Sequence, residues 1–310
     1  MTSHPRADAG SPASDLAGWI AARRPLLEAA LDQAFLPATA WPATIHQAVR
    51  YSLFAGGKRI RPLLALAAAE AVGGDAGDAL PLACAVEMIH TYSLIHDDLP
   101  AMDDDDLRRG KPTSHKVFGE AIAILAGDAL LTRAFHLMAA VGPEASSTAV
   151  RRRLAAMAVL GEAAGTTGLI GGQVLDLESE GRQVEAPTLE RLHRAKTGAL
   201  LSACVRGGAL LAGAGSADLA GLDAYGAAVG LAFQVVDDVL DGTADEAALG
   251  KTAGKDAATG KATYVSVHGL EKARAIAAGL LAGALAAVAP LGERGRILAA
   301  LAEMIVRRRA

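Results

Sequence analysis

The chain is organised around one stretch, His96-Asp97-Asp98-Leu99-Pro100-Ala101-Met102-Asp103-Asp104-Asp105-Asp106-Leu107-Arg108-Arg109-Gly110. Six carboxylates fall within ten positions, and two arginines follow at once. Clustered like charges repel each other, and their pKa values rise unless a cation holds them. Carboxylate oxygens without cysteine ligands suit Mg²⁺, which binds proteins through carboxylates and substrate phosphates. The two arginines suit a diphosphate that bridges to that metal.

A second acidic cluster lies far downstream, in Phe233-Gln234-Val235-Val236-Asp237-Asp238-Val239-Leu240-Asp241. Asp237 and Asp241 are one helical turn apart, so both carboxylates leave the same face of a helix. In the first cluster Pro100 interrupts the helix, so Asp97 and Asp103 converge only if the chain bends after Asp98. The sequence therefore predicts two acidic walls that can hold several Mg²⁺ ions between them.

Composition excludes several classes of protein. The 310 residues are 52% hydrophobic, which is enough for a large core. Aromatic residues make up only 4%, which argues against a β-sandwich and against an aromatic-lined nucleic-acid site. The net charge of −4 gives no electrostatic reason to expect DNA or RNA as a partner. Cys84 and Cys204 show no metal-ligand spacing, so we expect a reduced, cytoplasmic protein.

We expect a single all-α domain over residues 15–310, preceded by a disordered lead over residues 1–14. The lead is polar, contains two prolines and lacks the apolar segment of a signal peptide. No apolar run reaches the roughly 18 uncharged residues that a membrane span needs, so we expect no span. Apolar residues recur at helical spacing, without strand-type alternation. Helices are predicted at about 15–35, 42–56, 62–72, 78–98, 117–141, 144–164, 187–213 and 218–241, with two short ones after a loop over 242–263.

Other charged residues are ambiguous when taken alone. The run Lys58-Arg59-Ile60-Arg61 follows two glycines at a predicted helix start, where cations oppose the helix macrodipole. A bound diphosphate would remove that conflict. His90, on the helix that leads to the first acidic cluster, is by itself more often a structural histidine. Lys196 and the lysines of the 242–263 loop by themselves indicate only a solvated surface.

Taken together, the motifs resemble those of the trans-isoprenyl diphosphate synthases, most closely the bacterial farnesyl diphosphate synthases. The resemblance runs from about Trp41 to the C-terminus, whereas the first few dozen residues match weakly. The arginines at 307–309 cannot be aligned individually. Besides the second acidic cluster, the motifs are Gly56-Gly57-Lys58-Arg59-Ile60-Arg61-Pro62, His90-Thr91-Tyr92-Ser93-Leu94-Ile95-His96-Asp97-Asp98-Leu99-Pro100-Ala101-Met102-Asp103, Leu107-Arg108-Arg109-Gly110-Lys111-Pro112-Thr113, Gly171-Gly172-Gln173-Val174-Leu175-Asp176-Leu177 and Lys196-Thr197-Gly198-Ala199-Leu200.

The resemblance implies an all-α, single-domain helical bundle around a deep central cavity. It also implies a homodimer and three Mg²⁺ ions held between the walls. The metal ligands would be Asp97, Asp98, Asp103, Asp237, Asp238 and Asp241. Isopentenyl diphosphate would be held by Lys58, Arg61, His90 and Arg109. The allylic diphosphate would be held by Arg108, Lys196, Lys251 and Lys261.

The chemistry that the resemblance implies is ionisation, condensation and elimination. The allylic diphosphate leaves, the double bond of isopentenyl diphosphate attacks the resulting cation, and the adduct loses a proton. The departing diphosphate would serve as the base, and water must be kept from the cation. Dimethylallyl and then geranyl diphosphate would be the allylic partners. The catalytic residues would be Asp97, Asp98, Asp103, Arg108, Lys196, Thr197, Gln234 and Asp237, with Thr197 and Gln234 near the reacting carbons.

Product length would depend on Tyr92 and Ser93. In the family, the fifth residue before the first motif is the floor of the cavity, and an aromatic residue there goes with a fifteen-carbon product. Tyr92 lies ~7.5 Å down the helix from Asp97 but ~140° around it, so helix geometry alone does not choose it over Ser93. A core tyrosine bonded to a neighbour is the alternative. We expect farnesyl diphosphate as the product, with geranylgeranyl diphosphate as the alternative.

Three other functions would use some of the same residues. A terpene cyclase would share the aspartates but has no use for a second diphosphate pocket. The dipeptide His96-Asp97 also occurs in HD-type metal phosphohydrolases, with His46 as a further ligand, but that function leaves the second cluster and the arginines unexplained. A non-catalytic partner subunit would be free to lose its ligands, and none is missing here.

Overall fold

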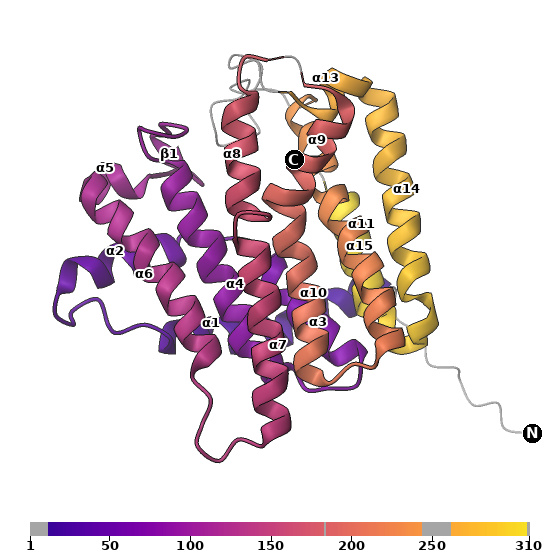
Figure 1. The fold of residues 1–310 in the computed structure, drawn as a ribbon, viewed down its shortest axis with the longest axis horizontal. Helices are drawn as coiled ribbons and strands as arrows, with labels where there is room; N and C mark the ends of the chain where they lie inside the picture. Colours follow the sequence, from indigo (N-terminus) through magenta and orange to yellow (C-terminus); the bar gives the residue numbers. More distant parts are fainter. Residues whose placement is uncertain (1–11, 183, 244–261, 309–310) are drawn as a thin grey trace, which may run out of the picture.

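The computed structural model describes residues 12–182, 184–243 and 262–308, and this part of the chain is almost entirely helical (Figure 1). The all-α prediction is confirmed. The elements are α1 (Pro12–Gln33), α2 (Ala43–Leu53), α3 (Ile60–Ala71), α4 (Ala76–Asp97), β1 (Leu107–Arg108), β2 (Lys111–Pro112), α5 (Ser114–Phe118), α6 (Glu120–Ala139), α7 (Ser147–Ala164), α8 (Leu169–Ser179), α9 (Ala186–His193), the π-helical turn η1 (Arg194–Gly198), α10 (Ala199–Ala212), α11 (Ser216–Asp241), α13 (Tyr264–His268), α14 (Leu270–Val288), the 3₁₀ segment η2 (Ala289–Gly295) and α15 (Arg296–Val306).

A small hairpin corrects the expectation of a chain without strands. β1 and β2 pair antiparallel, with Leu107 opposite Pro112 and Arg108 opposite Lys111. Gly110 in the turn has φ +74°. Strands of two residues are too short for an alternating pattern to appear in the sequence, because side chains alternate faces with a period of two.

Two predicted helices are divided in the structure. The helix predicted over 117–141 is divided into α5 and α6 by Gly119, whose φ of +84° is open to glycine but strained for other residues. The helix predicted over 187–213 consists of α9, the π turn η1 and α10. The first helix starts at Pro12 rather than at 15, and α14 is longer than the short helix expected there.

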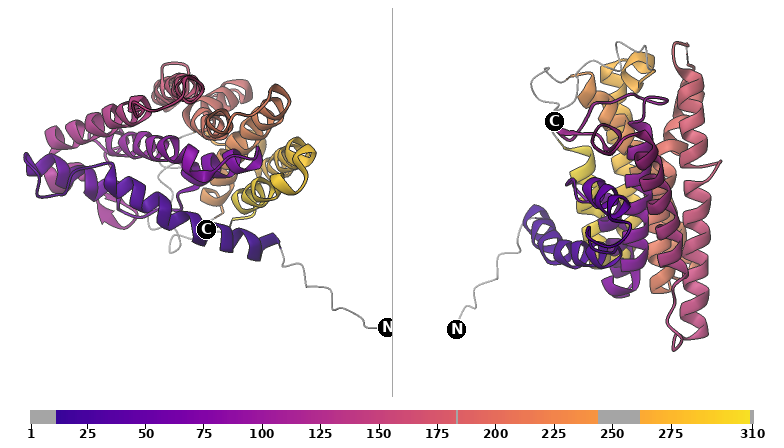
Figure 2. Two further views of the ribbon diagram at one scale, coloured as in Figure 1. Left: turned by 90° about the horizontal axis from the view of Figure 1, so that it is seen from below. Right: turned by 90° about the vertical axis from the view of Figure 1, so that its left-hand side faces the viewer.

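Helix α4 lies at the centre of the bundle, packed by α3, α6 and α10 (Figures 1 and 2). The close approach of α10 depends on glycine: a Cβ on Gly207 would lie 2.6 Å from Leu82 Cδ2 of α4. Each fully buried leucine-sized side chain contributes ~1.5–3 kcal/mol, so this contact surface holds α4 firmly. Fully buried residues of α4 include Leu82, Val86, Met88 and Ile89.

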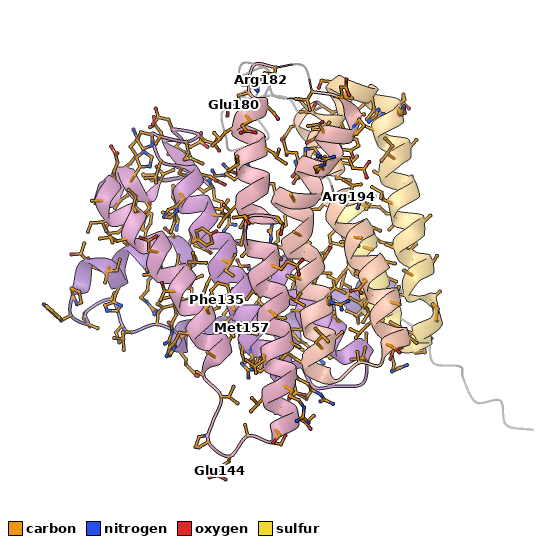
Figure 3. All side chains as sticks on the ribbon, in the orientation of Figure 1. Phe135, Glu144, Met157, Glu180, Arg182 and Arg194 are labelled. Carbon is orange, nitrogen blue, oxygen red and sulfur yellow. The ribbon has the colours of Figure 1, made fainter. Side chains whose placement is uncertain are left out.

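The bundle brings both acidic clusters to one end. In Figure 1 the hairpin, α9 and α13 lie at the upper end, where α4 leads into the hairpin and α11 leads toward α13. At mid-height α6 packs against α7, where a Cβ on Gly161 would lie 3.7 Å from the Phe135 ring, close to Met157 (Figure 3). Helices α4 and α11, which carry the two acidic clusters, are long and pack against several neighbouring helices.

Four stretches are long and apolar enough to cross a membrane by length and composition alone. The expectation that no segment qualifies is therefore not supported. Between 22% and 50% of each apolar window is buried inside the fold. The stretches are Glu120–Ala139, Ser147–Ser179, Ser216–Asp241 and Leu270–Val306.

Candidate active site

The first acidic wall is a helix end folded back on itself. The chain bends as the sequence requires, because the Asp103 N–H donates to Asp97 O at 2.8 Å and the Asp105 N–H donates to Asp98 O at 3.2 Å. The Thr113 hydroxyl donates to Asp105 O at 2.8 Å and fastens the hairpin to the same loop. These bonds bring Asp97 and Asp103 to one side of the helix end.

Within this wall Asp97 and Asp98 have different surroundings. Asp98 is buried and accepts a hydrogen bond from Arg108 Nε at 2.9 Å, so its charge is paired inside the protein. Burial raises the pKa of Asp97 to about 6, an effect opposed by the charge of Lys196 across the site and reinforced by that of Asp103. Asp97 is therefore a carboxylate that gains from a nearby cation.

The second acidic wall is tied to the C-terminal part of the chain. Arg308 lies 2.6 Å from an oxygen of Asp237, donates to Phe233 O at 2.7 Å and stacks 4.0 Å over the Phe233 ring. Asp238 is buried and accepts the Tyr264 N–H at 2.7 Å. Asp241 is exposed at the end of α11. Of the three aspartates, Asp238 has the most enclosed surroundings.

The π turn η1 places Lys196 and Thr197 between the walls. Lys196 Nζ donates to Asp176 of α8 at 2.6 Å. Thr197 donates to Gln234 Oε1 at 3.0 Å, and Gln234 Nε2 donates to Asp238 at 3.1 Å. A chain of hydrogen bonds thus runs from the predicted reaction site into the second wall.

Glycine explains how close η1 comes to α8. A Cβ on Gly172 would lie 2.7 Å from Lys196 Cβ and would also collide with the Lys196 backbone. Gly172 is thus part of the site, because it lets α8 carry Asp176 up to Lys196.

The predicted isopentenyl diphosphate pocket gathers cations around His90. Burial lowers the pKa of His90 well below its usual value, with the charges of Arg61 and Arg109 acting in the same direction. His90 is therefore neutral at pH 7 and can donate one hydrogen bond without adding charge. Arg109 donates to Gly56 O, and Lys58 is exposed on the same loop.

Arg59 and Arg61, at the start of α3, have different roles. Buried Nε of Arg61 has no hydrogen-bond partner within the described ranges, and its guanidinium lies 5.8 Å from the centre of the Phe233 ring. Arg59 is 4% exposed, has φ +53° and donates to Glu87 at 2.7 Å and to Glu28 at 3.0 Å. Arg59 therefore holds the loop to α1 and α4, which leaves Arg61 for an anion.

Tyr92 and Ser93, the residues expected to set product length, lie on α4. Tyr92 is 6% exposed on α4, and burial together with the charge of Asp97 raises the pKa of its hydroxyl. Ser93 donates to His90 O at 2.9 Å within its own helix. The charge of Asp97 thus acts on the Tyr92 hydroxyl.

Sequence reasoning missed four residues of this region: Arg59, Glu87, Asp176 and Arg308. Asp176 carried a signal, since it belongs to the Gly171–Leu177 motif near one helix face with Gln173. Arg308 carried only its positive charge. Lys251 and Lys261 lie outside the described residues, as do residues 1–11 of the N-terminal lead.

The donor set suits a hard cation. Both walls present carboxylate oxygens, the ligands that Mg²⁺ prefers. No three histidine, cysteine, aspartate or glutamate side chains in the described ranges come close enough to hold one ion by themselves. An ion here would need further oxygens, which water or a phosphate group can supply.

Comparison with known proteins agrees with this chemistry. The family model named polyprenyl synthetase matches residues 42–288. The farnesyl diphosphate synthase of Geobacillus stearothermophilus is 51% identical over 233 residues, covering 75% of this chain and 78% of that protein. The heterodimeric geranylgeranyl pyrophosphate synthase large subunit 1, chloroplastic, of Arabidopsis thaliana is 50% identical over 267 residues, covering 85% and 71%.

A solved structure extends the similarity to the whole fold. The geranylgeranyl pyrophosphate synthetase of Pyrococcus horikoshii is 32% identical with a TM-score of 0.85, covering 95% of this chain and 99% of that one. Its fold, like that of the present chain, is all-α. The chain belongs to the polyprenyl synthetase family and is a prenyltransferase of the trans-prenyl diphosphate synthase type.

Proposed function

We propose that this prenyltransferase condenses isopentenyl diphosphate with dimethylallyl and then geranyl diphosphate, with Mg²⁺, and releases farnesyl diphosphate. The observation that carries the product is Tyr92, a buried aromatic residue of α4 within the electrostatic influence of Asp97. A phenol ring below the metal-binding end would stop a growing apolar chain by overlap, which is costly in a packed site. The farnesyl diphosphate synthase at 51% identity supports this product.

Asp97 and Asp103 on the first wall and Asp237 on the second would hold the metal. When bound, Mg²⁺ neutralises the allylic diphosphate and makes it a better leaving group. Mg²⁺ usually binds through one or two carboxylates together with substrate phosphates, so we propose that metal and diphosphate bind together rather than in sequence. Asp97, whose pKa is raised by burial, gains from that cation.

The protein's own cations would complete the site. Arg108 and Lys196, each held by an aspartate, would bind the allylic diphosphate as its charge develops. Arg61, whose Nε has no partner among the described residues, would bind isopentenyl diphosphate beside neutral His90. Thr197 and Gln234, already hydrogen-bonded to each other, would line the cavity beside the reacting carbons.

Arg308 occupies the place where a metal would meet Asp237. We propose that Mg²⁺ displaces it from that carboxylate, since both are cations at one oxygen site. Both guanidiniums lie near the Phe233 ring, that of Arg61 at 5.8 Å and that of Arg308 at 4.0 Å from its centre.

The cellular setting is also a proposal. Cys84 and Cys204 are free and buried, which suits a reducing compartment such as the cytoplasm. A homodimer is proposed from the family resemblance, and it agrees with Ile124 and Leu125, apolar residues of α6 that are 44% and 52% exposed. Light scattering on the purified protein tests the dimer, which a monomeric mass would contradict.

A second candidate product is geranylgeranyl diphosphate, because relatives with that name are about as similar as the farnesyl synthase. The test is incubation of the purified protein with Mg²⁺, isopentenyl diphosphate and dimethylallyl diphosphate, followed by chromatography of the products. Fifteen-carbon product from wild type, and twenty or more carbons from Tyr92→Ala, are expected. Twenty-carbon product from wild type would favour the second candidate. No turnover by the protein alone would point to a partner subunit.

A further inference from the structure

We infer that His96 is a specificity-determining positioning residue, which holds the Tyr92 ring in place by fastening it to α6. This inference rests on the proposed role of Tyr92 as the floor of the product cavity. His96 precedes the first metal ligand in the sequence, yet its side chain does not join the acidic wall. Its contacts lead to α6 instead.

The first contact joins His96 to the backbone of α6. His96 Nε2 lies 3.1 Å from Ile124 O. A carbonyl oxygen only accepts hydrogen bonds, so Nε2 carries the proton and donates it. This hydrogen bond fixes one end of the His96 ring to α6, whereas His96 itself belongs to α4.

The second contact joins His96 to Tyr92, one turn earlier on α4. The ring centres are 5.7 Å apart and the ring planes meet at 77°, which is an edge-to-face arrangement. Such pairs are attractive and directional. A tyrosine that turned away from this position would lose that contact.

A glycine on α6 makes room for the arrangement. A Cβ on Gly127 would lie 2.6 Å from His96 Cδ2 and closer still to Nε2, so no larger residue fits here unless the ring moves. Glycine in a helix interior is unfavourable relative to alanine. Gly127 lies inside α6, and its lack of a side chain gives the histidine ring its seat.

These three observations form one device. The α6 backbone holds His96, and His96 packs against the Tyr92 ring and resists its displacement by a growing chain. Tyr92 determines the length at which elongation stops, and His96 determines how firmly the Tyr92 ring is held in that position. Loss of His96 should therefore change the product distribution more than the stability of the fold.

The test compares product lengths at matched turnover for wild type, His96→Ala, His96→Gln, Tyr92→Phe and Tyr92→Ala. His96→Gln keeps an N–H that can reach Ile124 O, so it preserves the packing of α4 on α6 should His96→Ala fold poorly. We expect the share of products longer than fifteen carbons to rise roughly two- to tenfold in both His96 variants, the range of one aromatic edge contact. Tyr92→Phe keeps the ring and should match wild type.

Two further variants make the result specific. His136→Gln removes an exposed histidine from the far end of α6 and should leave product length unchanged. The double variant Tyr92→Ala/His96→Ala should give the same products as Tyr92→Ala, because His96 acts through Tyr92. Thermal melting is recorded for every variant.

Each outcome decides one point. If Tyr92→Ala lengthens the product while both His96 variants keep the wild-type distribution, the inference about His96 is wrong and the floor stands. Added lengthening in the double variant would also contradict it, since His96 would then act independently. If Tyr92→Ala itself leaves the product at fifteen carbons, the floor assignment fails and the role of His96 fails with it.

Discussion

The two acidic walls carry similar aspartates but are built in opposite ways. The first is local: Asp97, Asp98 and Asp103 are positioned by bonds within a stretch of the chain that ends at the hairpin. The second is assembled from afar: the bond from Arg308 to Phe233 O joins residues 75 positions apart, and the Tyr264 bond to Asp238 spans 26. The first wall is formed once α4 ends, whereas the second requires the C-terminal part of the fold.

The largest effect on turnover should come from removing one carboxylate from each wall. Asp97→Asn and Asp237→Asn should each lower turnover by about three orders of magnitude, because each removes a proposed metal ligand while keeping the shape of the side chain. Steady-state rates across a Mg²⁺ titration measure this. Asp104→Asn is the matched control, since Asp104 lies exposed in the same loop as the first wall, and it should keep near-normal rates. Normal activity and unchanged Mg²⁺ dependence in Asp97→Asn would remove the first wall from the mechanism.

The cations facing the walls should separate the two substrates. Lys196 contributes its charge to the first wall, and Arg61 stacks on Phe233 of the second. Losing a charge-assisted hydrogen bond costs ~1.5–3 kcal/mol, about a 10- to 100-fold change in binding. Arg61→Ala should therefore raise the KM for isopentenyl diphosphate by that factor, and Lys196→Ala the KM for the allylic substrate. Equal changes for both substrates in both variants would show that the pockets are wrongly assigned.

Arg308 offers a smaller and more selective change to the second wall. Its ion pair with Asp237 is partly exposed, and such pairs contribute ~1 kcal/mol or less. Arg308→Ala should tighten Mg²⁺ binding in the presence of inorganic diphosphate by up to about fivefold, as measured by calorimetry. Arg307→Ala is the control, because Arg307 pairs with Glu303 at 3.6 Å and is exposed. Weaker metal binding in Arg308→Ala would contradict the proposed displacement.

A further effect concerns the stability of the metal-free protein. Burial raises the pKa of Asp97 from 3.8 to about 6, so the folded state holds this proton more tightly than the unfolded state. The resulting stabilisation is present in full below pH ~4 and is lost as pH rises through about 6. At pH 7 Asp97→Asn should therefore raise the free energy of unfolding by ~1–2 kcal/mol, and by much less at pH 4.

Thermal melting in EDTA at the two pH values measures that difference. Asp104→Asn changes the charge at an exposed position of the same loop and serves as the reference. A stabilisation by Asp97→Asn that is the same at pH 4 and pH 7 would show that ionisation of Asp97 is not its cause.

The same contrast explains what could be predicted from the sequence. The first wall could be predicted from the sequence, because Pro100 interrupts the helix and the bend follows within a few residues. In the second wall Asp237 and Asp238 are adjacent and identical in the sequence, yet one faces Arg308 and the other the backbone of Tyr264. Such a difference depends on residues far along the chain, and no local pattern contains it.

Other differences have similar causes. Gly119 was not recognised as a break because the apolar spacing continues through it, while its positive φ is a property of the folded backbone. Arg59 and Arg61 are two positions apart in one motif, but only the partners Glu28 and Glu87 show that Arg59 is structural. The fold class was predictable from periodicity, whereas the division of labour among similar charges was not.

The π turn at Arg194–Gly198 has a consequence for changes in chain length. A π turn accommodates one more residue than a turn of α-helix, so α9 and α10 keep their relative phase while the extra residue is absorbed within the turn. Deleting one residue there would restore a regular α-helix and leave the two flanking helices nearly in place. The side chains of the turn itself would be respaced, and Lys196 would lose its position opposite Asp176 although neither side chain had been altered. This part of the chain should accept many substitutions yet reject a deletion of a single residue.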